Sequence, residues 1–367
     1  MSMGLGGTGS KLASLINHGT AIIVDVSDTD LEKATVDNKV RAVVHSSRAQ
    51  MRGSRKDPQI GREAFQSVRD KLLEMIRGNI VFCATGGGTG NGMCSELLEY
   101  LSEMSGVDIV DKTMFVFVLP YADREASDFI DNSITFLEGP ISSAIDGGNT
   151  GNIILFSNQR KFEKRIPEKT YNEMIISSLN QFLDVPRKSE EFQNLDGNID
   201  YEDFMMYIAK PYFNHFCQFH FDPEVSFGTQ LKKNYNKLLL APDGTIEALF
   251  LLELPSQEMT KQFYGVIDYF AEENVSPIYS VLHNPNIKRP LITVSILYSR
   301  KPLELVETYN SISGKHKRHR VKKSLDQFVT LSKLEVDLTN EARKVFDDQG
   351  AADGDEILNV LKRIGKL

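Results

Sequence analysis

The chain has 367 residues, of which 41% are hydrophobic and 25% charged, and its formal net charge is −8. This length predicts two domains, and the negative charge argues against binding of nucleic acid through bulk charge. The 3 cysteines lack the spacing of metal ligands or of a disulfide framework. No apolar run approaches the length of a membrane span, and the N-terminus does not resemble a signal peptide. We therefore expect a cytoplasmic protein without its own metal-ligand cluster.

A first glycine-rich loop lies at the N-terminus and precedes a helix that starts near residue 12. Its pattern, G-x-G-x-x-G, predicts a phosphate loop at a helix N-terminus, with a flexible tail as the alternative. A dinucleotide fingerprint needs a strand directly before it. Residues 1–3 are too few for that strand, so we expect missing upstream residues or a sheet without it. The glycines assigned to the phosphates are Gly4, Gly6, Gly7 and Gly9.

A polar loop follows the next predicted strand. Residues 21–26 form an apolar strand, and the loop behind it carries Asp28 and Asp30. Ligands of open α/β sheets bind beyond the carboxyl ends of the strands, so these carboxylates can approach phosphate, ribose or metal-bound water. Alternatively, the loop caps a helix that starts near Leu31.

A basic loop follows a short strand predicted over residues 41–45. It is rich in Arg and Gly and precedes a helix predicted over residues 61–76. The loop can bind a terminal phosphate, or it can be a basic loop exposed to solvent without a ligand. The residues expected at the phosphate are Gly53, Ser54 and Arg55.

The sharpest motif is a second glycine-rich loop, between a buried strand over residues 79–83 and a helix from residue 93. Its glycines leave the backbone N–H groups uncovered, and the helix adds partial positive charge, so the loop can cradle a phosphate. A turn without a ligand needs one glycine and not five. The residues assigned to this cradle are Gly86, Gly87, Gly88, Thr89, Gly90, Asn91 and Gly92.

Further strands and helices alternate up to a long central helix. Strands are predicted over residues 113–120 and 152–156, and their loops carry Asp123 and Asn158. This alternation predicts an α/β fold with a doubly wound parallel sheet. A long helix over residues 168–185 and a polar stretch then lead to another helix.

In the second half of the chain, strands and helices no longer alternate regularly. Strands over residues 248–254 and 291–298 flank a predicted helix, which indicates a smaller α+β domain with a mixed sheet. Residues 315–323 form a basic run. The predicted parts are a nucleotide-binding domain (1–167), a central helix and its following loop (168–203), a second domain (204–323) and a helical tail (324–367).

Two motifs in this order resemble the tubulin/FtsZ superfamily. GGGTGNG at residues 86–92 resembles the family signature, and residues 198–203 fit its catalytic pattern N-x-D-x-x-D. Residues 57–62 and 157–159 resemble two further family segments. The order and spacing agree over residues 4–300.

The resemblance implies a GTPase with GTP or GDP and Mg²⁺ as cofactors, a central helix and an activation domain. It implies that the glycine loops hold the phosphates, that residues 53–55 sense the γ-phosphate, and that Asn158 and Asn172 contact guanine. It also implies that Asn198, Asp200 and Asp203 complete the site of the next subunit in a head-to-tail filament. In a protein outside this family, Asp200 would instead be the N-cap of a helix, and Asp203 would be an acidic residue in the first turn of that helix.

The length, the helical tail and the diverged residues 54–56 resemble the plasmid- and phage-borne TubZ branch. That resemblance implies DNA segregation through a DNA-binding adaptor at the C-terminal region or the basic run, without direct DNA contact. The basic run can instead contact a neighbouring subunit or be solvated. Two alternatives are an FtsZ-type division filament and a non-polymerising nucleotide-dependent regulator. A third hypothesis, a dinucleotide-dependent oxidoreductase, depends on the G-x-G-x-x-G pattern alone and leaves both family motifs unexplained.

Overall fold

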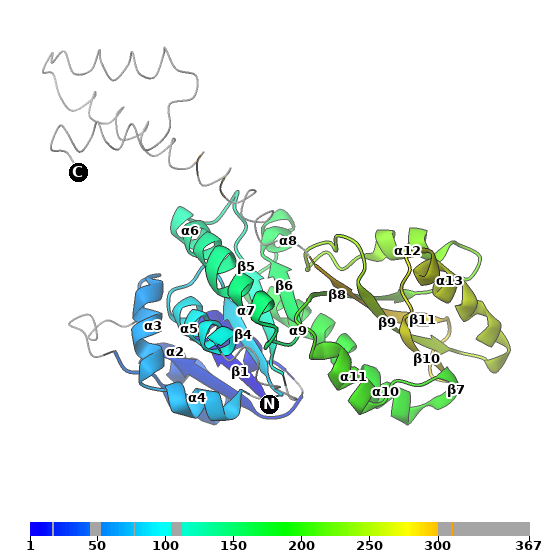
Figure 1. Ribbon diagram of the computed structural model, residues 1–367, viewed down its shortest axis with the longest axis horizontal. Coiled ribbons are helices and arrows are strands. Elements are labelled where there is room, and N and C mark those ends of the chain that lie inside the picture. The colour runs from blue at the N-terminus through cyan, green and yellow to red at the C-terminus, as the bar shows by residue number, and fades with distance from the viewer. Residues whose placement is uncertain are drawn as a thin grey trace, which may run out of the picture. The chain divides into compact units, whose positions relative to one another are not determined.

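An eleven-stranded sheet organises the part of the chain that the computed structural model describes, with the strand order β3-β2-β1-β4-β5-β6-β8-β11-β9-β10-β7 (Figure 1). The described residues are 1–16, 18–44, 53–76, 78–103 and 112–299, together with Asn310 and Gly314. They fall almost entirely in the compact unit Met1–Leu305; a second unit, Val306–Leu367, contains the basic run and the predicted tail, which lie outside the described residues.

The first half of the sheet is parallel, as predicted. Its central strands are almost wholly apolar because helices cover both faces, and every residue of β5 is buried. Its strands are β1 (Ser2–Leu5), β2 (Ala21–Asp25), β3 (Asn38–Arg41), β4 (Ile80–Ala84), β5 (Met114–Leu119) and β6 (Ile153–Ser157). Its helices are α1 (Gly6–Ala13), α2 (Asp28–Lys33), α3 (Pro58–Gln66), α4 (Arg69–Met75), α5 (Thr89–Glu103), α6 (Ser127–Phe136), the π-helix Leu137–Ile141, α7 (Ser142–Gly147) and α8 (Gln159–Glu163).

The second half of the sheet is mixed. β11 runs antiparallel to β8 and β9, whereas β9 and β10 are parallel and β7 closes the edge antiparallel to β10. The strands are β7 (Gln193–Gly197), β8 (Phe213–His220), β9 (Glu247–Leu254), β10 (Ile278–His283) and β11 (Leu291–Tyr298). The helices are α10 (Val185–Glu191), α11 (Tyr201–Ile208), α12 (Phe227–Asn234), the 3-10 helix Gln257–Phe263 and α13 (Tyr264–Glu272).

The long helix α9 (Glu168–Leu183) joins the two halves. Its buried face includes Tyr171, Ile175, Leu179 and Phe182 at helical spacing. The ring of Phe182 stacks on Phe216 of β8, with 5.0 Å between centroids. α9 therefore shares one core with strands of both halves. The sheet itself continues from β6 to β8 through the pair Ile153 and Phe213, so the boundaries near residues 167 and 203 stay a prediction.

Residues 1–3 do take part in a strand, and the expectation that they could not is wrong. β1 pairs in parallel with β2 on one side and β4 on the other. Four residues are sufficient because both neighbours accept and donate backbone hydrogen bonds, and Met3 and Leu5 are buried in the core. The strand that feeds the first glycine loop is therefore present.

Other elements also differ from their predicted bounds. The helices predicted to start near residue 12 and from residue 93 start earlier, at Gly6 and Thr89, inside the glycine motifs. The strand predicted over residues 41–45 spans Asn38–Arg41. The single helix predicted over residues 61–76 consists of α3 and α4. The polar stretch before residue 198 contains α10 and the edge strand β7, whose exposed residues lack an apolar pattern. Among the helices described, none is long and apolar enough to cross a membrane.

Candidate functional site

The two glycine-rich loops meet at one edge of the sheet. β1 leads into α1 and β4 leads into α5, and because β1 and β4 are parallel neighbours, both helix N-termini lie at the carboxyl edge. A cavity of about 200 Å³ opens between the loops. The predicted residues that line it are Gly6, Gly7, Gly53, Ser54, Gly87, Gly88, Thr89 and Gly90.

Close backbone approach explains the glycines at the centre of this cavity. Gly6 has φ +69°, and a Cβ there would lie 2.6 Å from the Gly90 nitrogen. A Cβ on Gly88 would lie 2.2 Å from the Ser54 hydroxyl. Gly7 differs, because its Cβ would meet only the Asp30 side chain, at 3.8 Å. Its backbone is therefore open to a ligand.

The remaining motif residues pack the loops and do not line the cavity. A Cβ on Gly9 would lie 2.2 Å from the Phe82 carbonyl oxygen, so this glycine lets α1 approach β4. Gly4, Gly86 and Gly92 meet similarly close neighbours. Asn91 is buried, and its amide donates to the Thr85 carbonyl inside the turn.

The third predicted loop joins the cradle through Ser54. The Ser54 hydroxyl accepts a hydrogen bond from the Thr89 N–H at 2.9 Å. Arg55 and Lys56 have φ of +49° and +67°, and Lys56, not Arg55, lines the cavity. The Lys56 ammonium lies 4.3 Å from the ring centroid of Phe129. The sequence predicted Arg55 at the phosphate, whereas Lys56 is the basic residue of this loop that lines the cavity.

Asp25, the last residue of β2, lines the same cavity and was not predicted. Its side chain is 2% exposed; Oδ1 accepts N–H bonds from Val26 and Ser27 at 2.7 and 3.1 Å, while the buried Oδ2 has no partner within the described structure. Burial raises its pKa to about 6, and repulsion from Asp30 adds to that shift. Its signal in the sequence was a lone ionisable residue within an apolar strand.

The carboxylates here fit a divalent cation. An ionised carboxylate beside bound phosphate is unfavourable unless a cation or proton accompanies it, and Mg²⁺ prefers carboxylate and phosphate oxygens. Asp25 and Asp30 line the cavity, whereas Asp28 is exposed and pairs with Arg41. Among the described residues no cluster of three His, Cys, Asp or Glu could hold a metal without help, so a cation here would also need ligand oxygens.

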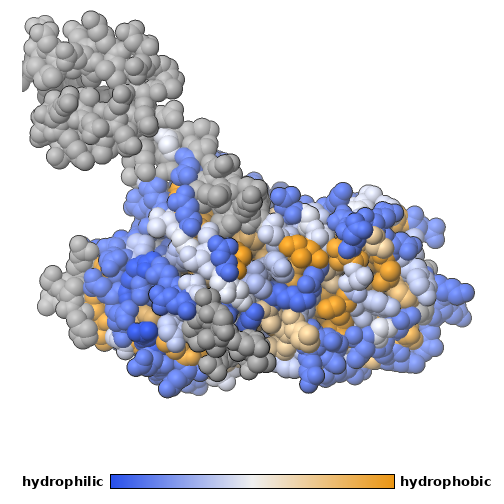
Figure 2. Space-filling view, viewed as in Figure 1, coloured by the Kyte–Doolittle hydropathy of each residue, from blue (hydrophilic) through white to orange (hydrophobic). Residues whose placement is uncertain are grey.

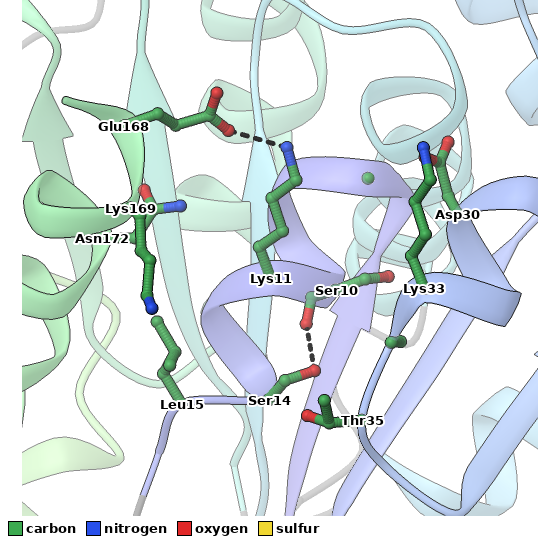
Figure 3. Close-up of a pocket in the computed structure, with 12 residues that line it drawn as sticks. Ser10, Lys11, Ser14, Leu15, Asp30, Lys33, Thr35, Glu168, Lys169 and Asn172 are labelled. Carbon is green, nitrogen blue, oxygen red and sulfur yellow. Dashed lines mark hydrogen bonds and ion pairs between the residues drawn. The ribbon is translucent and has the colours of Figure 1, made fainter.

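A second cavity, of about 490 Å³, adjoins the first and shares Gly7 and Asp30 with it. It lies between α1, α2 and the N-terminus of α9 (Figure 3). Asn172, a predicted base contact, is 8% exposed and lines it. Lys11 and Glu168 also line it, with 2.7 Å between Nζ and Oε1.

Asn158 and Asp123 line neither cavity. The Asn158 amide donates to both carboxylate oxygens of Glu125, at 3.2 and 3.1 Å. Asp123 accepts a hydrogen bond from the Tyr121 hydroxyl at 3.2 Å. Their roles at a nucleotide stay predictions.

The N-x-D-x-x-D segment lies at the opposite end of α9. The Asp200 carboxylate accepts from the Asp203 N–H at 2.8 Å and caps α11. Ser189 of α10 holds the loop, because its hydroxyl donates to Asn198 Oδ1 at 3.4 Å and accepts from the Ile199 N–H at 3.3 Å. A helix of α9's 16 residues spans about 24 Å, so this loop is remote from the cradle of its own subunit.

Comparison with known proteins agrees with this architecture. Residues 16–160 match the model of the Tubulin/FtsZ family, GTPase domain. The tubulin-like protein TubZ of Bacillus cereus is 26% identical over 208 residues, which cover 52% of this chain and 45% of that protein. The match thus spans less than half the length of this relative.

Solved structures share the fold at low identity. A GTPγS-form protofilament of TubZ from Bacillus thuringiensis serovar israelensis has a TM-score of 0.67 and 13% identity, covering 87% of this chain and 93% of that chain. FtsZ of M. jannaschii has a TM-score of 0.60 and 18% identity, covering 81% of this chain and 90% of that chain. Residues 16–160 therefore match the GTPase domain of the tubulin/FtsZ family, and the chain has the fold that TubZ and FtsZ share.

Proposed function

We propose that this chain binds GTP together with Mg²⁺ and hydrolyses it to GDP and phosphate. The observation that carries the proposal is the cavity in which two glycine loops converge and one buried carboxylate oxygen of Asp25 has no partner. The family of residues 16–160 supports GTP as the nucleotide.

Each part of the cavity has a distinct task in this proposal. Backbone N–H groups at the starts of α1 and α5 bind phosphate oxygens, assisted by the helix dipoles. Lys56 adds positive charge at the third loop. Asp25 and Asp30 hold Mg²⁺, which when bound neutralises charge on the phosphate oxygens.

Hydrolysis requires a second subunit in this proposal. Asp200 and Asp203 orient and polarise the attacking water, yet α9 separates them from the cradle of their own subunit by about 24 Å. A head-to-tail contact brings them to the nucleotide of the next subunit. Such a heterologous contact does not close on itself, so it propagates into a filament.

The surface around α11 supports this contact. Tyr201 and Met206, on the same helix as Asp203, are 61% and 69% exposed. Figure 2 shows hydrophobic residues among hydrophilic ones on the half of the molecule that holds α11 and the strands β8 to β11. Large exposed apolar side chains often mark protein interfaces.

The proposed cellular role is segregation of plasmid or phage DNA in the cytoplasm through a DNA-binding adaptor. The likeness to TubZ proteins supports it, including one from a Clostridium botulinum phage. An FtsZ-type division filament is the alternative that the likeness to FtsZ favours.

The test is the GTPase rate per subunit as a function of protein concentration. We expect a negligible rate below a critical concentration and a steep increase above it, together with filaments in electron micrographs. A non-polymerising regulator would bind GTP without this increase. A rate per subunit that is independent of concentration would contradict hydrolysis between subunits.

A further inference from the structure

The helix α10 and the strand β7 lie between the central helix and the N-x-D-x-x-D loop (Figure 1). α10 packs against both β7 and α11. An ion pair fixes α10 to the sheet, because Lys188 Nζ lies 2.6 Å from Oε1 of Glu253 on β9, whose side chain is 1% exposed. Asn284 donates to the other oxygen of that carboxylate at 2.7 Å. The next residue of α10, Ser189, is therefore held in place beside the loop.

The Ser189 hydroxyl joins three parts of the chain that meet at this loop. It lies 3.1 Å from the Ser280 hydroxyl of β10, accepts from the Ile199 N–H at 3.3 Å and donates to Asn198 Oδ1 at 3.4 Å. Ser189 and Ser280 are 5% and 0% exposed, so water does not compete for these bonds. Ser280 lies opposite Gly197, the residue before Asn198, in the register of β10 and β7.

These contacts determine which end of the Asn198 amide faces the protein. Oδ1 accepts from Ser189 and, at 3.4 Å, from Asn194 Nδ2 of β7. Nothing among the described residues accepts a hydrogen bond from Nδ2 of Asn198, and this residue is exposed. The two donors on the protein side therefore leave the amide N–H groups of Asn198 directed outward.

We propose that Ser189 is a positioning residue for GTP hydrolysis, which presents the Asn198 amide nitrogen to the nucleotide of the next subunit. This inference rests on the proposed function. Asp200 and Asp203 are anionic, as is the triphosphate that they approach, so their approach alone is repulsive. A fixed N–H donor beside them binds a phosphate oxygen and offsets part of that repulsion. Ser189 acts through Asn198 and does not touch the nucleotide.

The experiment is a double-mutant cycle on turnover by assembled filaments of the full chain. Asn198→Ala should lower the turnover per polymerised subunit about 100-fold, because it removes an oriented donor. Ser189→Ala should lower it about 3- to 10-fold, because it removes one hydrogen bond that holds this donor. Ser189→Ala combined with Asn198→Ala should be no slower than Asn198→Ala alone, because no amide is left to orient.

Two further measurements separate positioning from a general loss of structure. The affinity of the unpolymerised chain for GTP and the critical concentration for assembly should be the same in Ser189→Ala and the unmodified chain. Ser178→Ala is the matched control: its hydroxyl, on α9, accepts from Asn236 Nδ2 at 2.6 Å and bonds to no residue of the N-x-D-x-x-D loop. It should lose a hydrogen bond of the same kind and keep its turnover.

Asn194→Asp provides a second test if Ser189→Ala does not fold. Asn194 is exposed on the edge strand β7, and the substitution preserves its size. The new carboxylate cannot donate to Oδ1 of Asn198 and instead accepts from its amide nitrogen, which turns the amide around. Turnover should fall, and the fall should disappear when Asn198 is replaced by alanine.

The outcomes distinguish this inference from the proposed function. Losses that do not add in the cycle, with unchanged GTP affinity and assembly, support the inference. Normal turnover by Ser189→Ala or by Asn198→Ala overturns it and leaves the GTPase proposal standing, as does a full further loss from Ser189→Ala in the Asn198→Ala background. An unmodified chain whose rate per subunit does not increase with concentration overturns both.

Discussion

Stability and binding oppose each other at the Asp25 carboxylate. Its side chain is 2% exposed, and two backbone N–H groups bind Oδ1 while Oδ2 has no partner within the described structure, so folding without a ligand desolvates a charge that is only partly compensated. A cation in the cavity removes that cost. Natural sites commonly sacrifice stability in this way for function.

Asp25→Asn should therefore raise the melting temperature of the ligand-free protein and reduce the increase that GTP and Mg²⁺ produce. Removing the partly compensated charge should stabilise the fold by about 1–3 kcal/mol, while loss of the carboxylate weakens cation-dependent binding. Calorimetry with and without Mg²⁺ and GTP measures both effects. Asp37→Asn, at an exposed position, should change neither. A ligand-free Asp25→Asn variant that melts below the unmodified chain would contradict this account.

A second buried ionisable residue, His215, holds the chain between α12 and β9. It is 1% exposed; its Nδ1–H donates to the Leu240 carbonyl at 2.8 Å and its Nε2 accepts from the Asn236 N–H at 3.2 Å. The contact at Nε2 requires a neutral imidazole, because the protonated ring carries a hydrogen on that nitrogen. Burial lowers the pKa of His215 to about 4. Next to it, Leu240 and Leu238 exchange backbone hydrogen bonds with β6.

His215 should make the protein less stable as the pH falls. Between the unfolded pKa of 6.5 and the folded value near 4, the unfolded chain binds the extra proton, so the stability is complete above 6.5 and is lost as the pH decreases toward 4. The loss should amount to about 3 kcal/mol. Urea unfolding of His215→Gln should lack this component, whereas His220→Gln, at an exposed position of the same strand, should retain it.

Among the elements, α11 combines a structural and a chemical task in one side chain. Asp200 caps the helix through its bond to the Asp203 N–H, and it is also one of the two carboxylates proposed to orient the attacking water at the neighbouring site. The two readings of the N-x-D-x-x-D pattern, helix cap and catalytic pair, are therefore compatible. Different substitutions at this position can separate them.

Asp200→Asn should remove catalysis and keep the cap, whereas Asp200→Ala should remove both. Asparagine caps helices about as well as aspartate, and loss of the cap costs about 1 kcal/mol. Both variants should bind GTP and form long-lived filaments, but only Asp200→Ala should melt at a lower temperature. Sedimentation, GTPase assays and thermal unfolding measure these properties. Normal turnover by Asp200→Asn would exclude the catalytic role.

The predictable elements are those whose signal is local. Strands such as β5 are buried on both faces and appear as apolar runs, and the glycine loops stand out because close backbone approach excludes side chains. β7 and α10 were missed because their residues are largely polar and partly exposed. The split between α3 and α4 was missed because no Gly or Pro marks it.

Site residues that depend on tertiary contacts were harder to predict. Lys11 and Glu168 are 157 positions apart, and only the packing of α9 beside α1 brings them together. Asp25 was read as part of its strand, because its burial becomes apparent only when the neighbouring loops are in place. Lys56, and not the predicted Arg55, lines the cavity, and the two adjacent left-handed residues there follow no pattern that the sequence shows.

At the scale of the whole molecule, α9 separates the two halves of the proposed catalytic site, which are the phosphate cavity and the Asp200 loop. Its N-terminal end lines the second cavity through Glu168 and Asn172, and its other end leads through α10 to the Asp200 loop. A subunit that lacks one half-site can therefore still supply the other. This property distinguishes hydrolysis between subunits from hydrolysis within one subunit.

Mixing two inactive variants should restore activity. Gly7→Val should fold, since a Cβ there meets only the Asp30 side chain at 3.8 Å, but it should obstruct the phosphates. Asp200→Asn keeps its nucleotide, and a neighbouring Gly7→Val subunit supplies an intact loop. In a random equimolar copolymer one contact in four is competent, so roughly a quarter of the unmodified rate should return.

The control for this mixture is Asp200→Asn combined with a chain that carries both substitutions, which offers no intact loop and should stay inactive. Co-sedimentation must first show that the two variants enter the same filaments. If they do, and the first mixture hydrolyses no more GTP than its separate components, the loop acts within its own subunit. The 24 Å of α9 would then have to be bridged by a conformational change, since a helix of 16 residues cannot shorten without unfolding.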